Sequence, residues 1–227
     1  MASFSLNIAF TAEQLNILYI TGTNVVIAKS VNGLTPNVAW QVLRPMQSNH
    51  ISWVDDYGIY ASPVNITNGA RLNQMSQIPS AIVGQLYTLE SSTVITGPVS
   101  GGYPDTFSIL NHCPSYPYLT FGMTQSASVN GVDNAHNAIS AAPVLLQSTA
   151  FMAPQETVYV WLQSMITSNS VVTMIASPMT MMRFGNGITD ISVGYDSASG
   201  RFIPMGASLL RSGESAAEEY EFILPNL

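Results

Sequence analysis

Short runs of β-branched and aromatic residues alternate with turn residues over most of the chain. Dipeptides such as Asn68-Gly69 and Asn130-Gly131 favour tight turns between these runs. The pattern is typical of strands, which we predict at residues 24–31, 38–44, 50–62, 84–90, 118–129, 157–164 and 171–177. A hairpin is predicted at 189–205, where two short strands flank the turn sequence DSASG.

One short helix is predicted near the N-terminus, at residues 12–20. Thr11 and Gln14 have the spacing of a capping box, and apolar Leu15, Leu18 and Tyr19 follow. The chain shows no βαβ alternation, which argues against a parallel sheet. The sequence therefore predicts a mainly β protein, an antiparallel β-sandwich with one short N-terminal helix.

The same strand texture lies on both sides of residues 97–105 (GPVSGGYPD), so we expect a surface loop there and a single domain over residues 1–227. The tail at 213–227 concentrates acidic residues and is expected to be a solvated terminus, with a helix as the alternative.

In the methionine-rich run 174–184, Met179 and Met181 share one strand face. Core filling is the favoured interpretation, and an adaptable ligand surface is the alternative.

Two adjacent carboxylates, Asp55 and Asp56, lie within the strand-like stretch SNHISWVDDYGIYAS, residues 48–62. If residues 51–59 form one continuous strand, Asp55 shares a face with Trp53 and Tyr57. A buried carboxylate there would need Arg44, hydroxyl and amide donors, or a metal ion. The alternative is a turn between two shorter strands, with both carboxylates in water.

Composition removes several classes of function. Only 8% of residues are charged, against about 25% in typical soluble domains. The net charge is −7 and Lys29 is the only lysine, so nucleic acid is not expected as a partner. No apolar stretch is long enough for a transmembrane helix, and the N-terminus lacks the pattern of a signal peptide, so we expect a cytoplasmic protein. Cys113 is the single cysteine, which excludes an internal disulfide.

The sequence contains few candidate catalytic or metal-binding residues. The chain lacks the common nucleophile, metalloprotease and phosphate-loop motifs, so we predict that it is not an enzyme. Two further segments carry candidate ligands: residues 109–119, with His112, Tyr116 and Tyr118, and residues 131–137, with His136. Oxygen and nitrogen ligands in these segments could hold calcium, magnesium or zinc, although each also has an ordinary structural explanation.

Three segments, residues 38–62, 119–131 and 158–172, resemble a group of small fungal fruiting-body proteins to which the pink chromoprotein of oyster mushrooms belongs. The resemblance rests on strand texture and covers about two thirds of the chain. It implies a β-rich protein that holds a small organic chromophore without covalent attachment, together with a metal ion, and has no turnover. No ligand-binding residue carries over from the resemblance.

The favoured hypothesis is therefore a non-enzymatic pigment-binding and metal-binding protein. We expect aromatic residues to form the ligand site, namely Trp53, Tyr57, Tyr60, Tyr116 and Tyr118. The expected metal ligands are Asp55, Asp56, His112 and His136. The alternatives are a cytosolic defence protein, either a lectin or a membrane-active β-toxin, and a self-assembling structural or storage protein. Sparse surface charge also favours a homo-oligomer.

Overall fold

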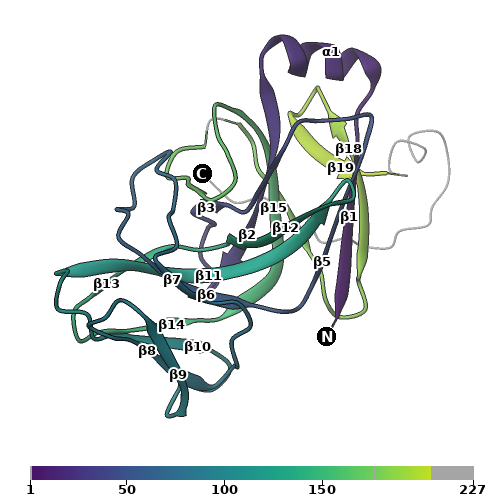
Figure 1. Ribbon diagram of the computed structural model, residues 1–227. Coiled ribbons are helices and arrows are strands. Elements are labelled where there is room, and N and C mark those ends of the chain that lie inside the picture. Colours follow the sequence, from purple (N-terminus) through teal and green to yellow (C-terminus); the bar gives the residue numbers. More distant parts are fainter. Residues whose placement is uncertain (1, 176, 206–227) are drawn as a thin grey trace.

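The computed structural model describes residues 2–175 and 177–205 (Figure 1). This part of the chain is mainly β with one short helix, α1 (Ala12–Ile20), which confirms the predicted fold class. The capping box forms as expected: the Gln14 amide donates to Thr11 Oγ1 at 3.2 Å, and the Thr11 amide donates to Gln14 Oε1 at 2.9 Å. None of the helices in the described ranges has the length and apolar character needed to cross a membrane.

The largest sheet has nine strands, seven of them in the order β19-β18-β1-β5-β11-β6-β7. Strands β12 and β13 also pair with β11, at opposite ends of its length. The strands are β1 (Ser3–Ala9), β5 (Ser48–Val54), β6 (Gly58–Ser62), β7 (Ser76–Ile78), β11 (Tyr118–Val129), β12 (Val132–Ala138), β13 (Ala142–Leu145), β18 (Asp190–Asp196) and β19 (Arg201–Pro204). The predicted hairpin is confirmed as β18 and β19.

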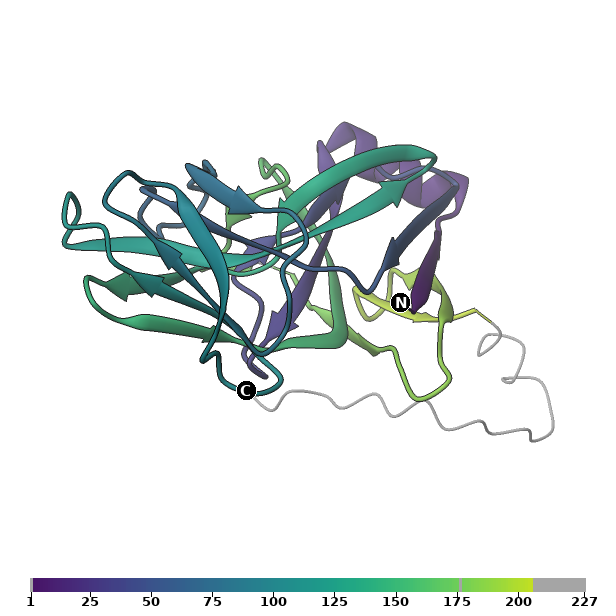
Figure 2. The same ribbon diagram turned by 60° about the horizontal axis from the view of Figure 1, so that its bottom comes forward.

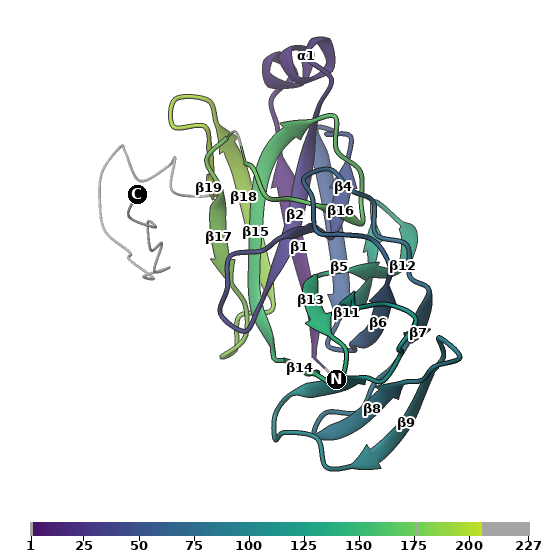
Figure 3. The same ribbon diagram turned by 90° about the vertical axis from the view of Figure 1, so that its left-hand side faces the viewer.

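Among the described residues, two four-stranded sheets and one two-stranded sheet accompany the nine-stranded sheet. The order β17-β15-β2-β4 joins β2 (Thr23–Val31), β4 (Gln41–Leu43), β15 (Pro154–Ser164) and β17 (Thr180–Arg183). The order β14-β10-β8-β9 joins β8 (Gln85–Leu89), β9 (Ile95–Ser100), β10 (Phe107–Asn111) and β14 (Thr149–Met152). The two-stranded sheet pairs β3 (Val38–Ala39) with β16 (Ser170–Val171). The sheet that contains β8 and β9 lies at the opposite end of the molecule from α1 (Figure 3).

The sheets are not purely antiparallel, contrary to the prediction. Strand β1 pairs in parallel with β18, and β8 pairs in parallel with β10. Parallel neighbours require a long connection, and the connection from β8 to β10 passes through β9 on the far side of β8. Strand β1 and the hairpin of β18 and β19 therefore lie side by side (Figure 2).

Several predicted boundaries were wrong. The strand predicted at 38–44 is interrupted at Trp40, and the strand predicted at 171–177 is reduced to its first residue, within β16. Part of the loop predicted at 97–105 belongs to strand β9, which contains a cis peptide bond between Gly97 and Pro98. In the methionine-rich run, Met182 is buried in the main core and Met179 packs against a second apolar cluster. The acidic tail at 213–227 lies outside the described residues.

The main core lies between the nine-stranded sheet and the sheet that contains β2. Val25, Ile27 and Val31 of β2 face this core, where they join apolar residues of the nine-stranded sheet such as Ile51 and Ile59. The other face of β2 is also covered, because Val26 and Ala28 belong to the second cluster. Burial on both faces explains why β2 reads as a continuous β-branched run.

Candidate functional site

Lys29, the only lysine of the chain, lies inside the main core. Alternation along β2 places it on the same face as Val25, Ile27 and Val31, and its side chain is fully buried. A buried ammonium requires polar partners, because its transfer out of water costs several kcal/mol when it is unpaired. The surroundings of Lys29 therefore make it the first candidate for a functional residue.

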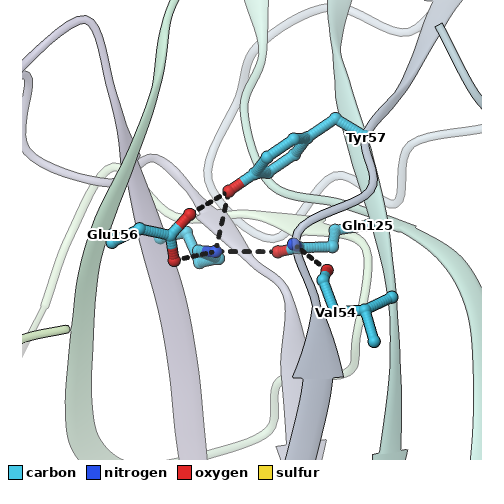
Figure 4. Close-up of polar contacts among 5 residues, drawn as sticks. Val54, Tyr57, Gln125 and Glu156 are labelled. Carbon is cyan, nitrogen blue, oxygen red and sulfur yellow. Dashed lines mark hydrogen bonds and ion pairs between the residues drawn. The ribbon is translucent and has the colours of Figure 1, made fainter. Parts of the chain in front are cut away.

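Three oxygen atoms accept hydrogen bonds from the Lys29 ammonium. The acceptors are Gln125 Oε1 at 2.8 Å, Tyr57 Oη at 3.2 Å and Glu156 Oε2 at 3.4 Å. Tyr57 in turn donates to Glu156 Oε1 at 2.6 Å, and Gln125 Nε2 donates to the carbonyl oxygen of Val54 at 2.8 Å. Figure 4 shows Tyr57, Gln125 and Glu156 converging from three separate segments of the chain. All three N–H bonds of the ammonium are thus satisfied.

Local irregularities of the strands position two of these partners. Glu156 lies where the pairing of β15 with β2 is irregular, between Pro154 and Val158. Such an irregularity redirects a side chain relative to the regular pleat. Tyr57 belongs to the short segment between β5 and β6, and its ring is buried against Phe107. Gln125 lies at the start of the corresponding irregularity between β11 and β12.

Aromatic rings surround the ammonium and form an aromatic cage of Trp40, Trp53 and Tyr57. The ammonium nitrogen lies 5.6, 5.5 and 5.2 Å from the respective ring centroids. Contacts at this distance are attractive through the ring quadrupole, and more so when water is excluded. Trp40 Nε1 donates to the carbonyl oxygen of Gln125 at 2.8 Å, which fixes the ring at the break between β3 and β4.

Burial and neighbouring charges shift the pKa of Lys29 in opposite directions. Burial lowers the pKa of its ammonium from 10.5 to about 8, although Glu156 and, more weakly, Asp55 oppose this change. Burial and then the Glu156 carboxylate raise the pKa of Tyr57, so this phenol stays protonated. The pKa of Asp55 is also raised, mainly because its carboxyl group is partly buried and secondarily because of the nearby Glu156 carboxylate. The residue as a whole is exposed, at the outer edge of the network. The centre thus holds one cation, a neutral phenol and two carboxyl groups.

A cavity of about 450 Å³ includes Lys29 in its wall, and we call it the Lys29 cavity. Its volume lies within the range of about 300–1,000 Å³ that is usual for small-molecule sites. Apolar side chains form much of the wall, including Val31, Ile139, Val144 and Met152. Three apolar residues of the wall, Leu34, Leu145 and Phe151, are at least half exposed to solvent and therefore mark the opening of the cavity. The cavity therefore combines an apolar entrance with a wall that contains the caged lysine.

Residues 51–59 do not form one continuous strand. Strand β5 ends at Val54 and β6 begins at Gly58, so the carboxylates lie in the turn that we had considered as the alternative. Asp55 is nevertheless coupled electrostatically to Lys29 and Glu156. Arg44, which we had considered as its partner, lies over the ring of Tyr19 at 4.5 Å.

The predicted aromatic ligand-binding residues do not form one site. Trp53 and Tyr57 meet at Lys29. Tyr60 is fully buried and donates to the carbonyl oxygen of Ser140 at 2.8 Å, and Tyr118 donates to Asn65 Oδ1 at 2.8 Å. Tyr116 packs partly buried against the main core, and neither it nor Tyr118 belongs to the wall of the Lys29 cavity.

The four predicted metal ligands also do not converge. Asp56 accepts from Ser80 Oγ at 2.7 Å, and His112 Nδ1 lies 3.7 Å from a carboxylate oxygen of Glu90. His136 is on β12, where its backbone rather than its ring contacts Ser126 and Gln74. Within residues 2–175 and 177–205, no group of three or more His, Cys, Asp or Glu side chains is arranged to hold a metal ion.

The sequence interpretation missed Lys29, Trp40, Gln125 and Glu156 as site residues. Lys29 could have been found, because strict alternation along a β-branched strand places this single lysine on the core face. Glu156 and Gln125 reach it through irregular strand pairings, which leave no comparable signal in the sequence. Comparisons with protein-family profiles, curated proteins and solved structures found no match to the chain. The resemblance to fungal fruiting-body proteins therefore stays a prediction.

Proposed function

We propose that the protein binds a small, mostly apolar organic molecule of the pigment type in the Lys29 cavity, without turnover. The observation that carries this proposal is the joint position of Lys29 in a caged ion network and in the wall of a cavity of about 450 Å³. A site of this kind is mostly apolar and fixes its ligand through a few polar groups.

Polar groups for orientation are present beside the apolar wall. Thr35, Ser148 and Thr149 belong to the wall of the cavity, and within the described part of the protein their hydroxyls make no hydrogen bond. Each hydroxyl can donate or accept, so the oxygen atoms of a conjugated ligand would find partners there. The apolar entrance at Leu34 and Phe151 would cover the hydrocarbon part of the same ligand.

The caged lysine supports binding rather than catalysis. A nucleophilic lysine needs a free lone pair, whereas each N–H of Lys29 donates to an oxygen atom. Tyr57, whose pKa is raised by burial, stays protonated and donates to Glu156. The network thus holds the charge of Lys29 fixed inside the core. Because the four predicted metal ligands lie apart, the proposal does not include a metal ion.

The proposal is tested by closing the entrance of the cavity. Ala142 lines the cavity and is exposed, so Ala142→Trp would add bulk at the opening without overpacking the core. Ala198→Trp adds the same ring in an exposed turn after β18 and serves as the matched control. The probe is anilinonaphthalene sulfonate, followed by its fluorescence.

We expect the wild-type protein and Ala198→Trp to bind the dye with the same affinity, and Ala142→Trp to bind it at least about tenfold more weakly. Thermal unfolding of each variant shows that the fold is intact. Equal dye affinity in all three proteins would contradict the proposal, as would an absence of saturable binding to the wild-type protein.

We also propose that copies of the chain associate. Strand β14 forms one edge of its sheet, carries no charged side chain and exposes half of Phe151, which packs against Tyr103. Uncharged edges with exposed apolar side chains invite pairing with another chain. Sedimentation equilibrium should therefore show dimers or larger species, and monomers alone at all concentrations would contradict this part of the proposal.

A further inference from the structure

Lys29 and Gln125 bring an amine and a side-chain amide into contact across the main core. Lys29 is on β2 and Gln125 is on β11, and these strands belong to different sheets. Both side chains are buried. Lys29 Nζ donates to Gln125 Oε1 at 2.8 Å, and a C=O bond is about 1.2 Å long, so the nitrogen lies within about 4 Å of the amide carbon Cδ. The contact therefore places a potential nucleophile beside an electrophilic carbon.

The Glu156 carboxylate also contacts this amine. Its Oε2 atom lies 3.4 Å from Lys29 Nζ, and Tyr57 donates to its Oε1 atom at 2.6 Å, which restrains the carboxylate. A carboxylate at this position can accept a proton from an attacking nitrogen and return it to a leaving group. Glu156 is therefore placed to serve as both general base and general acid for a reaction between the amine and the amide.

The surroundings hold the two groups together and exclude water. The aromatic cage of Trp40, Trp53 and Tyr57 encloses the amine, with ring centroids at 5.6, 5.5 and 5.2 Å from Nζ. The amide of Gln125 is held at both ends, because its oxygen accepts from the lysine and its Nε2 donates to the carbonyl oxygen of Val54 at 2.8 Å. Such restraint raises the effective concentration of the reacting groups, and the exclusion of water suppresses hydrolysis of the amide.

We propose that Lys29 and Gln125 form an intramolecular isopeptide bond. The neutral amine of Lys29 attacks Cδ of Gln125, so both nitrogens are then attached to the same carbon. Glu156 Oε2 takes one proton from Nζ and passes it to Nε2, which leaves as ammonia. The Nζ–Cδ bond forms and the Cδ–Nε2 bond breaks, so atoms and charge balance without an oxidant or a cofactor. The reaction occurs once per chain and involves no turnover.

The protonation state of Lys29 controls this reaction. The ammonium form is unreactive, because it has no lone pair and its N–H bonds are engaged by Gln125, Tyr57 and Glu156. Burial lowers the pKa of Lys29 to about 8, whereas Glu156 and, more weakly, Asp55 oppose this change, and Tyr57 stays protonated. The ion network therefore prevails at neutral pH, and the reactive amine becomes the main form in alkaline solution. The cross-link goes beyond the ligand site proposed above and does not depend on it.

The bond would join two sheets that are otherwise held together by packing. Lys29 and Gln125 are 96 residues apart in the chain, so their bond closes a long loop. A covalent link of this kind restricts the unfolded chain and thereby favours the folded state. Because Cys113 is the single cysteine, an internal disulfide cannot supply such a link. We expect the cross-linked protein to unfold at a higher temperature than the unlinked protein.

The test follows the intact mass of the purified full chain over days at about pH 6 and at about pH 9. We expect the mass to fall by about 17 Da, the mass of one ammonia molecule, and to fall at least about tenfold faster at the higher pH. Protease digestion should then yield a peptide that joins part of β2 to part of β11. Because Lys29 is the only lysine of the chain, the linked lysine is identified without ambiguity.

Three variants separate this reaction from other losses of ammonia. A succinimide formed at an Asn-Gly sequence gives the same change in mass but no linked peptide, and it would persist in Lys29→Met. Glu156→Gln should slow the cross-linking at least about tenfold, because the amide cannot accept the proton. Glu13→Gln makes the same change on the exposed surface of α1 and should leave the rate unchanged.

The linked peptide is the decisive observation, and it is sought in the wild-type protein, so the result does not depend on the stability of a variant. Its absence after alkaline incubation would overturn the proposal. Equal rates of cross-linking in Glu156→Gln and Glu13→Gln would overturn it as well, because the proton transfer through Glu156 would then be wrong. A loss of ammonia that is equally fast in Lys29→Met would assign the mass change to another site and have the same consequence.

Discussion

The titration of Lys29 gives the most quantitative prediction for this protein. In the unfolded chain the ammonium keeps its proton up to a pKa near 10.5, whereas burial lowers the pKa to about 8 in the folded state. Between these values the unfolded state binds more protons than the folded state, so the free energy of unfolding rises with pH. Below about pH 8 both states are protonated, and this contribution no longer changes.

The size of the effect follows from the two pKa values. A tenfold change in proton affinity corresponds to about 1.4 kcal/mol, so the charged form of Lys29 is disfavoured in the fold by roughly 3 kcal/mol. Between about pH 7 and about pH 9.5, the wild-type protein should gain roughly 2 kcal/mol from this group. Lys29→Met has no titrating group at this position and should not show the gain.

The measurement is urea unfolding followed by tryptophan fluorescence, for both proteins at several pH values. The difference in free energy of unfolding between wild type and Lys29→Met should change by roughly 2 kcal/mol in favour of the wild type as the pH rises. A difference that stays constant within error would refute the reasoning. In Glu156→Gln the gain should begin at lower pH, because Glu156 raises the pKa of Lys29.

Three further variants test single contacts, each by its free energy of unfolding. Tyr57→Phe removes the donor to Glu156 and should cost about 1–3 kcal/mol, whereas no change would mean that the bond is absent. Gly122→Ala would place a methyl group against the carbonyl oxygen of Ser140 and should cost about 2 kcal/mol or more, so a neutral result would contradict the close packing there. Thr11→Ala removes the helix cap and should cost about 1 kcal/mol, with the loss of protection in hydrogen exchange confined to α1.

Local signals in the sequence predicted the elements that depend on local interactions. The capping box at Thr11 predicted helix α1 with its observed bounds, and the β-branched run after Gly22 predicted strand β2. Strand breaks and parallel pairings depend on distant partners. Trp40 interrupts a predicted strand, and its ring is fixed by the backbone of Gln125, which is 85 residues away. No nearby residue indicates that contact.

For the candidate site too, the sequence predicted the residues that lie close together along the chain but not their distant partners. Trp53 and Tyr57 were predicted as site residues from a stretch of aromatic residues beside acidic ones, and both contact Lys29. The charge that organises them was expected at Asp55 but lies on Lys29, which comes from a different sheet. The position of Lys29 in a core strand was readable from alternation, whereas its pairing with Glu156 required the structure.

Native mass spectrometry on protein isolated from the cells that make it, with an absorption spectrum of the same sample, tests most directly whether the Lys29 cavity is a ligand site. We predict a bound organic mass at one per chain, with its own absorption band, and loss of both when Ala142→Trp replaces the wild-type chain in those cells. A mass equal to that of the bare chain, or a bound compound that is retained by Ala142→Trp, would contradict a ligand site in this cavity.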